Sequence, residues 1–422
     1  MKVALITYEF YPDFGGVGQN CNSFCKSFQN DEISLHVFNQ FYKSKNIFNV
    51  LDKLREKEYR LRDLLIFLKK KRLIYYLLLS IWLILRDKKT PFSYKLRMIA
   101  YLLFKPDILI RTMKNVNAIY PYLKKLKVDL IFGGSSASNL LPLIFILSRI
   151  FKTKVISYAH GNEFLVRSSW SLKTYYLKMM DKVILSNTKI KALIKKVNHL
   201  PDAQLEIIPY GLVLKDYEVN DSKSSIRKEF NIPNDQYVLI SVGRHVPRKK
   251  FDLVIKALNE IKQRISSMKI RYLLIGEGPE TKNLKDLVNT LNLENEVKFL
   301  GAFGGTKRNK YLKLSDLFLM PSIVLKESIE GFGIVYLEAN YYHLPVIGTF
   351  TGGIVDAVID GKTGLLINPN DLDDLIEKII YLWKEKETRT KMGDIGHNRV
   401  IEEFNWNKIR DKYINLFRTL VG

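Results

Sequence analysis

Short apolar runs rich in β-branched residues alternate with helical patterns along most of this chain, and the alternation occurs twice. In the first half we expect strands at residues 3–7, 33–38, 128–132, 154–158 and 183–186. In the second half we expect them at residues 237–242, 271–275, 297–300, 317–320, 345–348 and 364–367. Buried parallel strands have this apolar character, and strand–helix alternation is typical of a doubly wound sheet. The sequence therefore predicts an α/β fold with two doubly wound domains in succession.

The length of the chain also favours two domains. A chain of 422 residues exceeds the size at which one hydrophobic core keeps growing. The polar segment 218–225 is the expected linker, so we assign residues 1–213 to the first domain and residues 214–403 to the second. Ligands of such folds bind outside the carboxyl ends of the strands, and we expect the site in a cleft between two facing domains.

The positive charge of the chain is unevenly placed. The net charge is +24, and residues 1–213 carry +20 of it, with 35 Lys+Arg against 15 Asp+Glu. Residues 214–422 carry 32 and 28, a net of +4. A basic domain should meet an anionic partner such as lipid headgroups, nucleic acid or an acidic glycan. No recognisable nucleic-acid-binding module accompanies the charge, so we predict no nucleic-acid partner.

Residues 51–105 depart from the strand–helix alternation and hold a net charge of +10. Within them the uncharged run 73–85 lies between the basic clusters 69–72 and 86–89. Thirteen helical residues span about 20 Å, short of the roughly 20 residues that a membrane crossing needs. The segment is either an amphipathic helix in the membrane interface, with lysines reaching phosphates, or a buried helix with basic ends. The first interpretation predicts an anionic membrane surface as partner.

The cysteines and the N-terminus indicate the compartment. Cys21 and Cys25 are the only cysteines and lie one helical turn apart, so no disulfide framework is expected and a reducing cytosol is the simplest setting. The apolar start of the chain is too short for a secretory signal and is interpreted as a first strand. With the basic segment, these features predict a cytoplasmic protein, peripheral on the inner face of the cell membrane.

Two candidate site clusters follow strands of the first domain. Gly15 and Gly16 come after the first strand and open a helical pattern, where a ligand can approach the backbone closely. The spacing is not GxGxxG, so it does not indicate a nicotinamide cofactor, and an ordinary turn is the alternative. His160 stands at the end of the strand 154–158. A lone histidine is more often structural, but this position favours a residue that faces the cleft.

A third cluster, GRHVPRKKFD, follows the strand 237–242. Arg244 offers a planar fork of donors and Lys249 a point charge, a combination that suits a diphosphate. A solvated basic loop is the alternative, because most runs of charge are solvated. The position of the loop after a strand of the second domain favours a site.

The fourth cluster is a pair of glutamates, Glu330 and Glu338, with seven residues between them. Gly331, Phe332 and Gly333 follow the first glutamate and precede a helical pattern. The free N–H groups of a helix start and the helix dipole favour an anion, whereas ionised carboxylates only accept hydrogen bonds and suit hydroxyl groups. The pattern of hydroxyl, phosphate and hydroxyl is that of a sugar nucleotide. Two surface glutamates at a helix start are the alternative.

Together these residues resemble the retaining glycosyltransferases of family 4, whose GT-B fold has two Rossmann-like domains. The segments that carry the resemblance are IPYGLVLKDY (208–217), GRHVPRKK (243–250), LLIGEGPE (273–280), KFLGAF (298–303), ESIEGFGIVYLEAN (327–340) and PVIGTFTGGIVDAVIDGKTGLLINPND (345–371). The resemblance covers most of the chain except residues 40–125. It implies an acceptor-side first domain, a second domain that binds a nucleotide sugar, and a last helix, about 404–422, that crosses back onto the first domain.

The resemblance also implies roles for the second-domain residues. Arg244 and Lys249 would hold the diphosphate as it leaves, and Glu330 would contact hydroxyls of the transferred sugar. The amides of the Gly331–Phe332–Gly333 turn would add donors near phosphate and sugar. Glu338 would accept hydrogen bonds from the ribose.

Three further contacts are implied on either side of the cleft. Leu300 would lie near the nucleobase through its backbone. Gly15 and Gly16 would approach the phosphates from the first domain, and His160 would contact the donor sugar.

Two positions depart from the pattern of the family. Lys250 stands where a glycine is usual, and Asp356 stands where a glutamate is common. We expect no metal and no other cofactor, because Arg, Lys and a helix N-terminus can neutralise a diphosphate. The one nearby D-x-D, at Asp371 and Asp373, is better interpreted as a helix cap.

The resemblance implies a hexosyltransferase-type enzyme that retains anomeric configuration, through same-face attack and an oxocarbenium-like state. We expect it to move sugar from a nucleotide-diphosphate sugar to a glycan or lipid-linked acceptor, in cell-envelope polysaccharide or lipopolysaccharide synthesis. A sugar-nucleotide epimerase on the same fold is the alternative, and product analysis without any acceptor would separate the two.

Overall fold

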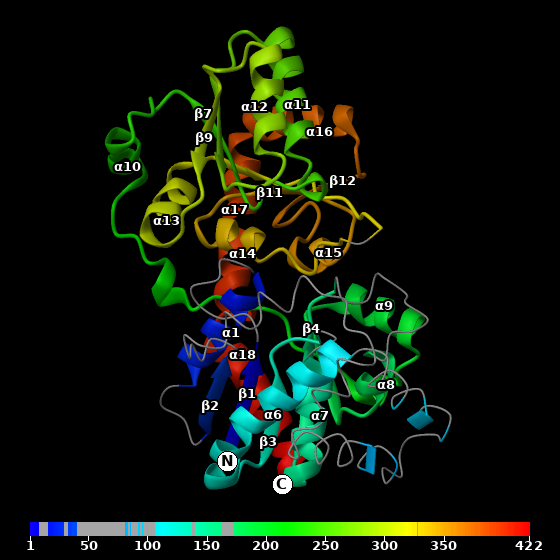
Figure 1. The fold of residues 1–422 in the computed structure, drawn as a ribbon. Helices are drawn as coiled ribbons and strands as arrows, with labels where there is room; N and C mark the ends of the chain where they lie inside the picture. The colour runs from blue at the N-terminus through cyan, green and yellow to red at the C-terminus, as the bar shows by residue number, and fades with distance from the viewer. Residues whose placement is uncertain are drawn as a thin grey trace. The chain divides into compact units, whose positions relative to one another are not determined.

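The computed structural model describes residues 1–7, 16–28, 33–39, 81–82, 85, 92, 95–96, 99, 106–136, 140–161, 173–326 and 328–422. The chain divides into two compact units. Unit 1 comprises Met1–Leu185, Lys191–Ile208 and Lys412–Gly422, and unit 2 comprises Ser186–Ile190 and Pro209–Asp411. Each unit contains one sheet whose described strands are parallel, as Figure 1 shows.

In unit 1 the strands lie in the order β2-β1-β3-β4-β5-β6. Their bounds are β1 Lys2–Thr7, β2 Ser34–Asn39, β3 Leu130–Gly133, β4 Lys154–Ala159, β5 Lys182–Leu185 and β6 Leu205–Ile207. The central strands are buried on both faces, as their continuous apolar sequences require. The strand order reverses between β1 and β3, because β2 lies on one side of β1 and the later strands lie on the other.

The helices that accompany this sheet in the chain are α1 Gly16–Ser27, α6 Pro106–Leu126, α7 Leu140–Phe151, α8 Lys173–Lys178, α9 Thr188–Asn198 and α18 Trp406–Val421, with the short 3₁₀ turn η2 Asp202–Gln204. Helix α7 is apolar all round, and Leu140 to Ser148 are all buried. On α18, the Tyr413 ring packs edge-on against Phe24 of α1, with ring centroids 4.9 Å apart. The ring centroid of Phe417 lies 6.1 Å from that of Phe132 in β3. The predicted return of the last helix onto the first domain is therefore confirmed.

In unit 2 the strands lie in the order β12-β11-β10-β7-β8-β9. Their bounds are β7 Tyr237–Val242, β8 Ile270–Ile275, β9 Val297–Gly301, β10 Leu317–Leu319, β11 Val346–Thr349 and β12 Gly364–Ile367. The helices are α10 Lys223–Glu229, α11 Phe251–Arg264, α12 Thr281–Thr290, α13 Gly305–Leu314, α14 Ile334–Tyr341, α15 Ile354–Ala357, α16 Leu372–Lys384 and α17 Lys386–Glu403, with 3₁₀ turns η3 Leu214–Tyr217 and η4 Pro247–Lys249.

The strand order of unit 2 decides where its ligand site belongs. Strands β8 and β9 extend the sheet to one side of β7, and β10, β11 and β12 extend it to the other. Ligands of doubly wound sheets bind at the carboxyl ends of the strands where this order reverses, which here is between β7 and β10. The loops that leave those two strands are residues 243–250 and residues 320–333.

The predicted fold class is confirmed, and the eleven predicted strands match observed strands to within about two residues. The short strand β6 was not predicted. Asp371 caps α16, because its side chain accepts from the backbone N–H of Asp374 at 3.0 Å, as expected for the D-x-D segment. Apart from seven scattered positions, the basic segment 51–105 lies outside the described residues. Among the helices that the structure describes, none is long and apolar enough to cross a bilayer.

Candidate functional site

The loop after β7 is fixed by close backbone contact with the loop after β8. A Cβ on Gly276 would overlap the carbonyl oxygen of Gly243, and one on Gly278 would overlap the carbonyl oxygen of His245. The His245 N–H donates to the carbonyl of Glu277 at 3.0 Å. Glycine is therefore required at both positions of the second loop. Because this loop is fixed, Arg248 and Lys249, which follow it in η4, are held in one defined position.

Lys249 and Arg248 turn inward from the 3₁₀ turn η4 and meet the same carboxylate oxygen. Lys249 Nζ donates to Glu330 Oε2 at 2.5 Å and lies 3.0 Å from Met320 Sδ. Arg248 donates through Nη1 to Glu330 Oε2 and through Nε to Ser328 Oγ at 2.9 Å. The structure thus brings Lys249 and Glu330, two of the predicted site residues, into contact and adds Arg248 to them.

The electrostatics of this cluster favour the ionised form of the Glu330 carboxyl. Burial would raise the pKa of the Glu330 carboxyl, but the charges of Lys249 and Arg248 outweigh burial and lower that pKa to about 2. Burial lowers the pKa of Lys249, and the attraction of Glu330 opposes this shift. The side chains of Lys249 and Arg248 are only 9% and 13% exposed, so water screens these interactions weakly.

The turn that follows Glu330 opens helix α14. Gly333 precedes the helix with φ of +83°, and a Cβ there would lie 2.6 Å from the Tyr336 ring. The Phe332 ring is buried and packs edge-on against Tyr210, with ring centroids 5.6 Å apart. In the described part of the chain, the backbone amides of Gly331, Phe332 and Gly333 have no assigned acceptor. A helix N-terminus with unused amides is favourable for an anion.

The second glutamate of the pair, Glu338, lies in the middle of α14 and is fully buried. Tyr217 Oη donates to Glu338 Oε1 at 2.7 Å, and Arg308 Nη2 lies 3.1 Å from the same oxygen. Tyr217 comes from η3 and Arg308 from α13. Glu338 is therefore a buried acceptor inside a polar cluster, not a surface glutamate at a helix start.

Other predicted donor-binding residues of unit 2 lie at the ends of β7 and β9. Arg244 is exposed, and its guanidinium pairs with none of the described residues. Leu300 is the penultimate residue of β9, and Gly301 follows it with φ of +81°. The Gly301 carbonyl accepts from the N–H of Gly276 at 2.9 Å, which joins this end of β9 to the clamped loops.

In unit 1 the predicted residues lie near the point where its strand order reverses. Gly16 is the first residue of α1, whereas Gly15 lies outside the described residues. His160 directly follows β4, stacks on Tyr158 with ring centroids 4.7 Å apart, and has Nε2 2.8 Å from the carbonyl oxygen of Gly134. Gly134 follows β3, so the imidazole lies beside the carboxyl end of β3.

Sequence reasoning missed four side chains of these clusters: Arg248, Ser328, Arg308 and Tyr217. Arg248 stands within RKK, and only the 3₁₀ turn shows which of the three cations meet Glu330. A signal for Arg308 and Tyr217 existed in IVYLEANY, which is apolar around nearly the whole helix. A buried helix that contains a glutamate must bring a cation or donors to it from elsewhere.

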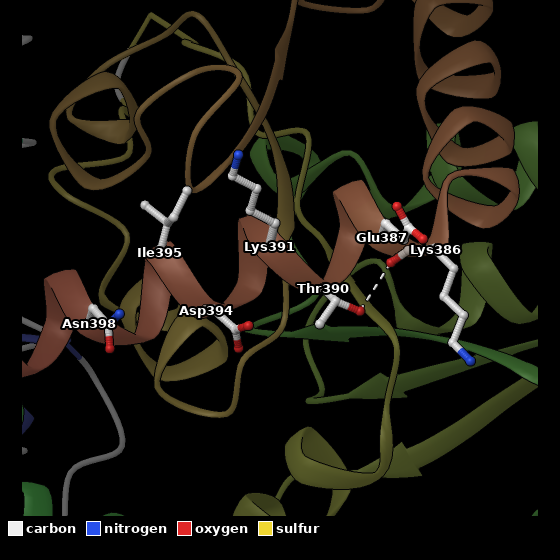
Figure 2. Close-up of a pocket in the computed structure, with 7 residues that line it drawn as sticks. All are labelled: Lys386, Glu387, Thr390, Lys391, Asp394, Ile395 and Asn398. Atoms are coloured by element: carbon white, nitrogen blue, oxygen red, sulfur yellow. Dashed lines mark hydrogen bonds between the residues drawn. The ribbon is translucent and has the colours of Figure 1, made fainter.

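A hollow on unit 2 does not coincide with this site. One face of α17 lines it, with Lys386, Glu387, Thr390, Lys391, Asp394, Ile395 and Asn398, as Figure 2 shows. The Thr390 hydroxyl in it donates to the Lys386 carbonyl at 3.0 Å. None of these residues belongs to the loops after β7 and β10.

One of the two Rossmann-like units carries Lys249, Arg248 and a helix start at its reversal point, an arrangement that favours a phosphate-bearing ligand in such folds. Residues 222–399 match the family model described as glycosyl transferases group 1. This match lies within unit 2, and the likeness of the whole chain to solved structures shows that its fold is the GT-B fold.

Individual relatives are similar to the chain as well. The chain is 28% identical over 209 residues to a GDP-mannose-dependent alpha-(1-6)-phosphatidylinositol monomannoside mannosyltransferase of Mycolicibacterium smegmatis, covering 49% of this chain and 54% of that protein. It is 27% identical to an N-acetyl-alpha-D-glucosaminyl L-malate synthase of Bacillus anthracis, covering 63% of this chain and 68% of that protein. The match thus spans about half the length of the first relative. The crystal structure of Anabaena HepE in complex with UDP superposes with a TM-score of 0.69 at 17% identity, covering 100% of both chains.

Proposed function

We propose that the protein is a retaining glycosyltransferase that moves a sugar from a nucleotide-diphosphate sugar to a glycan or lipid-linked acceptor. One observation carries the proposal. Lys249, Arg248 and Glu330 converge where the strand order of unit 2 reverses, beside the unused amides that open α14. Cations and amides suit a diphosphate, and an ionised carboxylate suits the hydroxyls of a sugar.

Each residue has a proposed role in the transfer reaction. Arg244 and Lys249 stabilise the diphosphate as negative charge develops on it, and the amides of Phe332 and Gly333 add donors. Glu330 accepts hydrogen bonds from the transferred sugar, because its lowered pKa keeps it ionised at neutral pH. From unit 1, His160 contacts the sugar, and the departing phosphate accepts the proton of the acceptor hydroxyl on the same face.

The printed names of the relatives fit a sugar nucleotide as donor. One relative is named as GDP-mannose-dependent, and the HepE structure contains UDP. The first name describes transfer of a sugar from a nucleotide sugar, which supports a transferase over a sugar-nucleotide epimerase. The mannosyltransferase is named for a phosphatidylinositol-linked acceptor, which supports a lipid-linked or polysaccharide acceptor here.

Unit 1 is the proposed acceptor side, peripheral on the inner face of the membrane. Residues 1–213 carry a net charge of +20, which favours anionic lipid. Pelleting with vesicles that contain anionic lipid, at low and high salt, tests this part. Binding that salt weakens is expected, and no binding at low salt would contradict it.

No metal is required in this mechanism, because two cations and a helix start already face the proposed diphosphate. Transfer should therefore continue at an undiminished rate after dialysis against EDTA. A loss of transfer that Mg²⁺ or Mn²⁺ restores would refute this part of the proposal.

The central test has two stages. Thermal stabilisation by a panel of UDP-, GDP- and ADP-sugars identifies the donor, since a ligand that binds the native state raises apparent stability. Transfer by Glu330→Gln is then compared with transfer by Glu402→Gln, an exposed glutamate elsewhere on unit 2. We expect Glu330→Gln to lose transfer by at least roughly a hundredfold and Glu402→Gln to keep it. Equal turnover in the two variants would reject the site, and epimerised donor without acceptor would favour the isomerase.

A further inference from the structure

The short segment Ser186–Ile190 contacts the turn that follows Glu330. It lies directly after β5 in the chain and belongs to unit 2. Asn187 Nδ2 donates to the carbonyl oxygen of Gly331, and Ser186 Oγ donates to the same oxygen at 3.3 Å. Ser186 and Asn187 are each 1% exposed. One carbonyl of the turn thus accepts hydrogen bonds from two buried side chains.

The other contacts of Asn187 determine how its side chain is oriented. Oδ1 accepts from the backbone N–H of Ile190 at 2.9 Å, so Asn187 caps the start of α9. The opposite end of the side-chain amide, Nδ2, has two hydrogens. One donates to Ser186 Oγ at 2.8 Å, and the other donates to Gly331. Capping requires only Oδ1, whereas the bond from Nδ2 acts on the turn after Glu330.

The preceding carbonyl of the same turn is held from the loop after β11. The Gly353 N–H donates to the carbonyl of Glu330 at 2.9 Å. A Cβ on Gly353 would lie 2.1 Å from the Gly331 oxygen and 2.4 Å from Asn187 Nδ2. No side chain fits there, so glycine at this position lets Asn187 and the turn approach each other.

The geometry of the peptide unit turns these contacts into a direction for the backbone amides. In a trans peptide, the carbonyl oxygen and the N–H that follows it point to opposite sides. The N–H of Phe332 therefore points away from Asn187, which holds the Gly331 carbonyl. This N–H has no acceptor within the described part of the chain. Asn187 thus sets the direction of an unused amide at the start of α14.

We propose that Asn187 is a positioning residue that orients the Phe332 amide toward the diphosphate of the nucleotide sugar. The inference rests on the proposed function, because it needs a diphosphate at the start of α14. Negative charge on the departing diphosphate grows in the transition state, and an amide of fixed orientation stabilises it without reorganisation. Loss of the Asn187 N–H should therefore lower kcat much more than it raises the KM for the nucleotide sugar.

The test uses substitutions that keep the helix cap and remove the N–H. Aspartate and serine cap helices about as well as asparagine, but the aspartate side chain donates nothing when ionised and the serine hydroxyl reaches less far. Removing one donor of this kind costs about a hundredfold or more in kcat, so misdirecting one should cost at least roughly tenfold. We expect that loss in Asn187→Asp and in Asn187→Ser, while the KM changes by less than about threefold. The rate is expressed per binding-competent molecule, counted from the stoichiometry of calorimetric titration with UDP, GDP or ADP, whichever binds.

Asn340 offers matched controls in the same unit. It is also 1% exposed, and its Nδ2 donates to the backbone carbonyls of Leu344 at 2.9 Å and Thr363 at 3.1 Å. Asn340→Asp and Asn340→Ser therefore remove a buried amide donor of the same kind, near the other end of α14. Both should lower stability and leave kcat per competent molecule unchanged.

The Phe332 amide itself gives a direct measurement. In the full chain labelled with ¹⁵N-phenylalanine, its resonance is the one that Phe332→Leu lacks. A hydrogen bond to a phosphate moves an amide proton downfield, so the saturating nucleoside diphosphate should move this signal in the parent and in Asn340→Asp. The shift should be largely lost in Asn187→Asp. A purely structural role of Asn187 would leave the shift intact in the molecules that still bind.

The outcomes separate this inference from the proposed function. If the parent binds none of UDP, GDP and ADP and transfers no sugar, both fail. If the parent transfers sugar without a shift at Phe332, or if the Asn187 variants keep either its kcat or its shift, the positioning role fails and the proposed function stands. An equal loss of kcat in the Asn340 variants also rejects the positioning role. Losses of kcat and of the shift that are confined to the Asn187 variants support the inference.

Discussion

Replacing Glu330 by glutamine removes the one carboxylate that compensates two poorly exposed cations, Lys249 and Arg248. Removing one partner of a buried ion pair costs about 3–5 kcal/mol. The pKa of Glu330 gives the size of this loss of stability independently. A fall from 4.5 to about 2 is worth about 3 kcal/mol of native-state stability. We therefore expect Glu330→Gln to lower the free energy of unfolding of unit 2 by about 3 kcal/mol at pH 7.

The assay is calorimetric or urea-induced unfolding of the parent, Glu330→Gln and the exposed control Glu402→Gln. For a unit of this size, about 3 kcal/mol lowers the midpoint temperature by roughly 6–12 °C. The control should change the free energy of unfolding by less than about 0.5 kcal/mol. If Glu330→Gln melts within roughly 1 °C of the parent, the cluster does not stabilise unit 2, and the reasoning from burial and pairing is wrong.

The same variant gives a pH dependence with a definite sign. The pKa of Glu330 is lower in the folded state than the 4.5 of the unfolded state, so its contribution is complete above about pH 4.5. It is lost as the pH falls from 4.5 towards 2, where the folded protein also takes up the proton. The stability difference between parent and Glu330→Gln should therefore be constant from pH 7 to about pH 5 and should shrink below pH 4.5. A difference that grows on acidification would contradict the assignment of a lowered pKa.

Two backbone positions give further predictions. Lys250 holds φ of +54° before α11, so Lys250→Gly should raise the free energy of unfolding by about 0.5 kcal/mol. Lys256→Gly, inside the same helix, should lower it by about 1 kcal/mol, and equal effects would argue against strain at Lys250. Gly333→Ala should cost about 2–4 kcal/mol in urea unfolding, because φ is +83° and the Tyr336 ring lies 2.6 Å from the new Cβ. Gly361→Ala, with φ of +70° in open space, should cost only about 1 kcal/mol, and a larger loss there than at Gly333 would refute the steric argument.

The fold was predictable because its strands are buried on both faces. Runs such as YVLISV at β7 and GLLI at β12 are apolar throughout, and no other common arrangement places so many of them between helices. Strand β6 was missed because LEI has three residues and a central glutamate. A strand at the edge of the sheet beside β5 needs little apolar sequence, so periodicity gives no signal for it.

The site was only partly predictable, since its geometry depends on contacts between distant segments. The sequence identified Lys249 and Glu330 by type and position, but their 2.5 Å contact follows from the clamp between the loops after β7 and β8. The departure at Lys250 was visible in the sequence, and its left-handed backbone explains why a glycine is usual there. Arg308 gave no local signal, because what it contacts lies 30 residues further along the chain.

The charges at the two carboxylates show how a site with two acids can still receive an anion. The ion pairs are Arg248–Glu330, Lys249–Glu330 and Arg308–Glu338. Three cations thus face two carboxylates, and the exposed guanidinium of Arg244 follows β7 without a partner among the described residues. Each acid is compensated by at least one cation that is at most 15% exposed, so neither would repel a diphosphate at full strength. The surplus positive charge lies at the end of β7, where the proposed diphosphate would lie, and the carboxylates would remain as acceptors for hydroxyls.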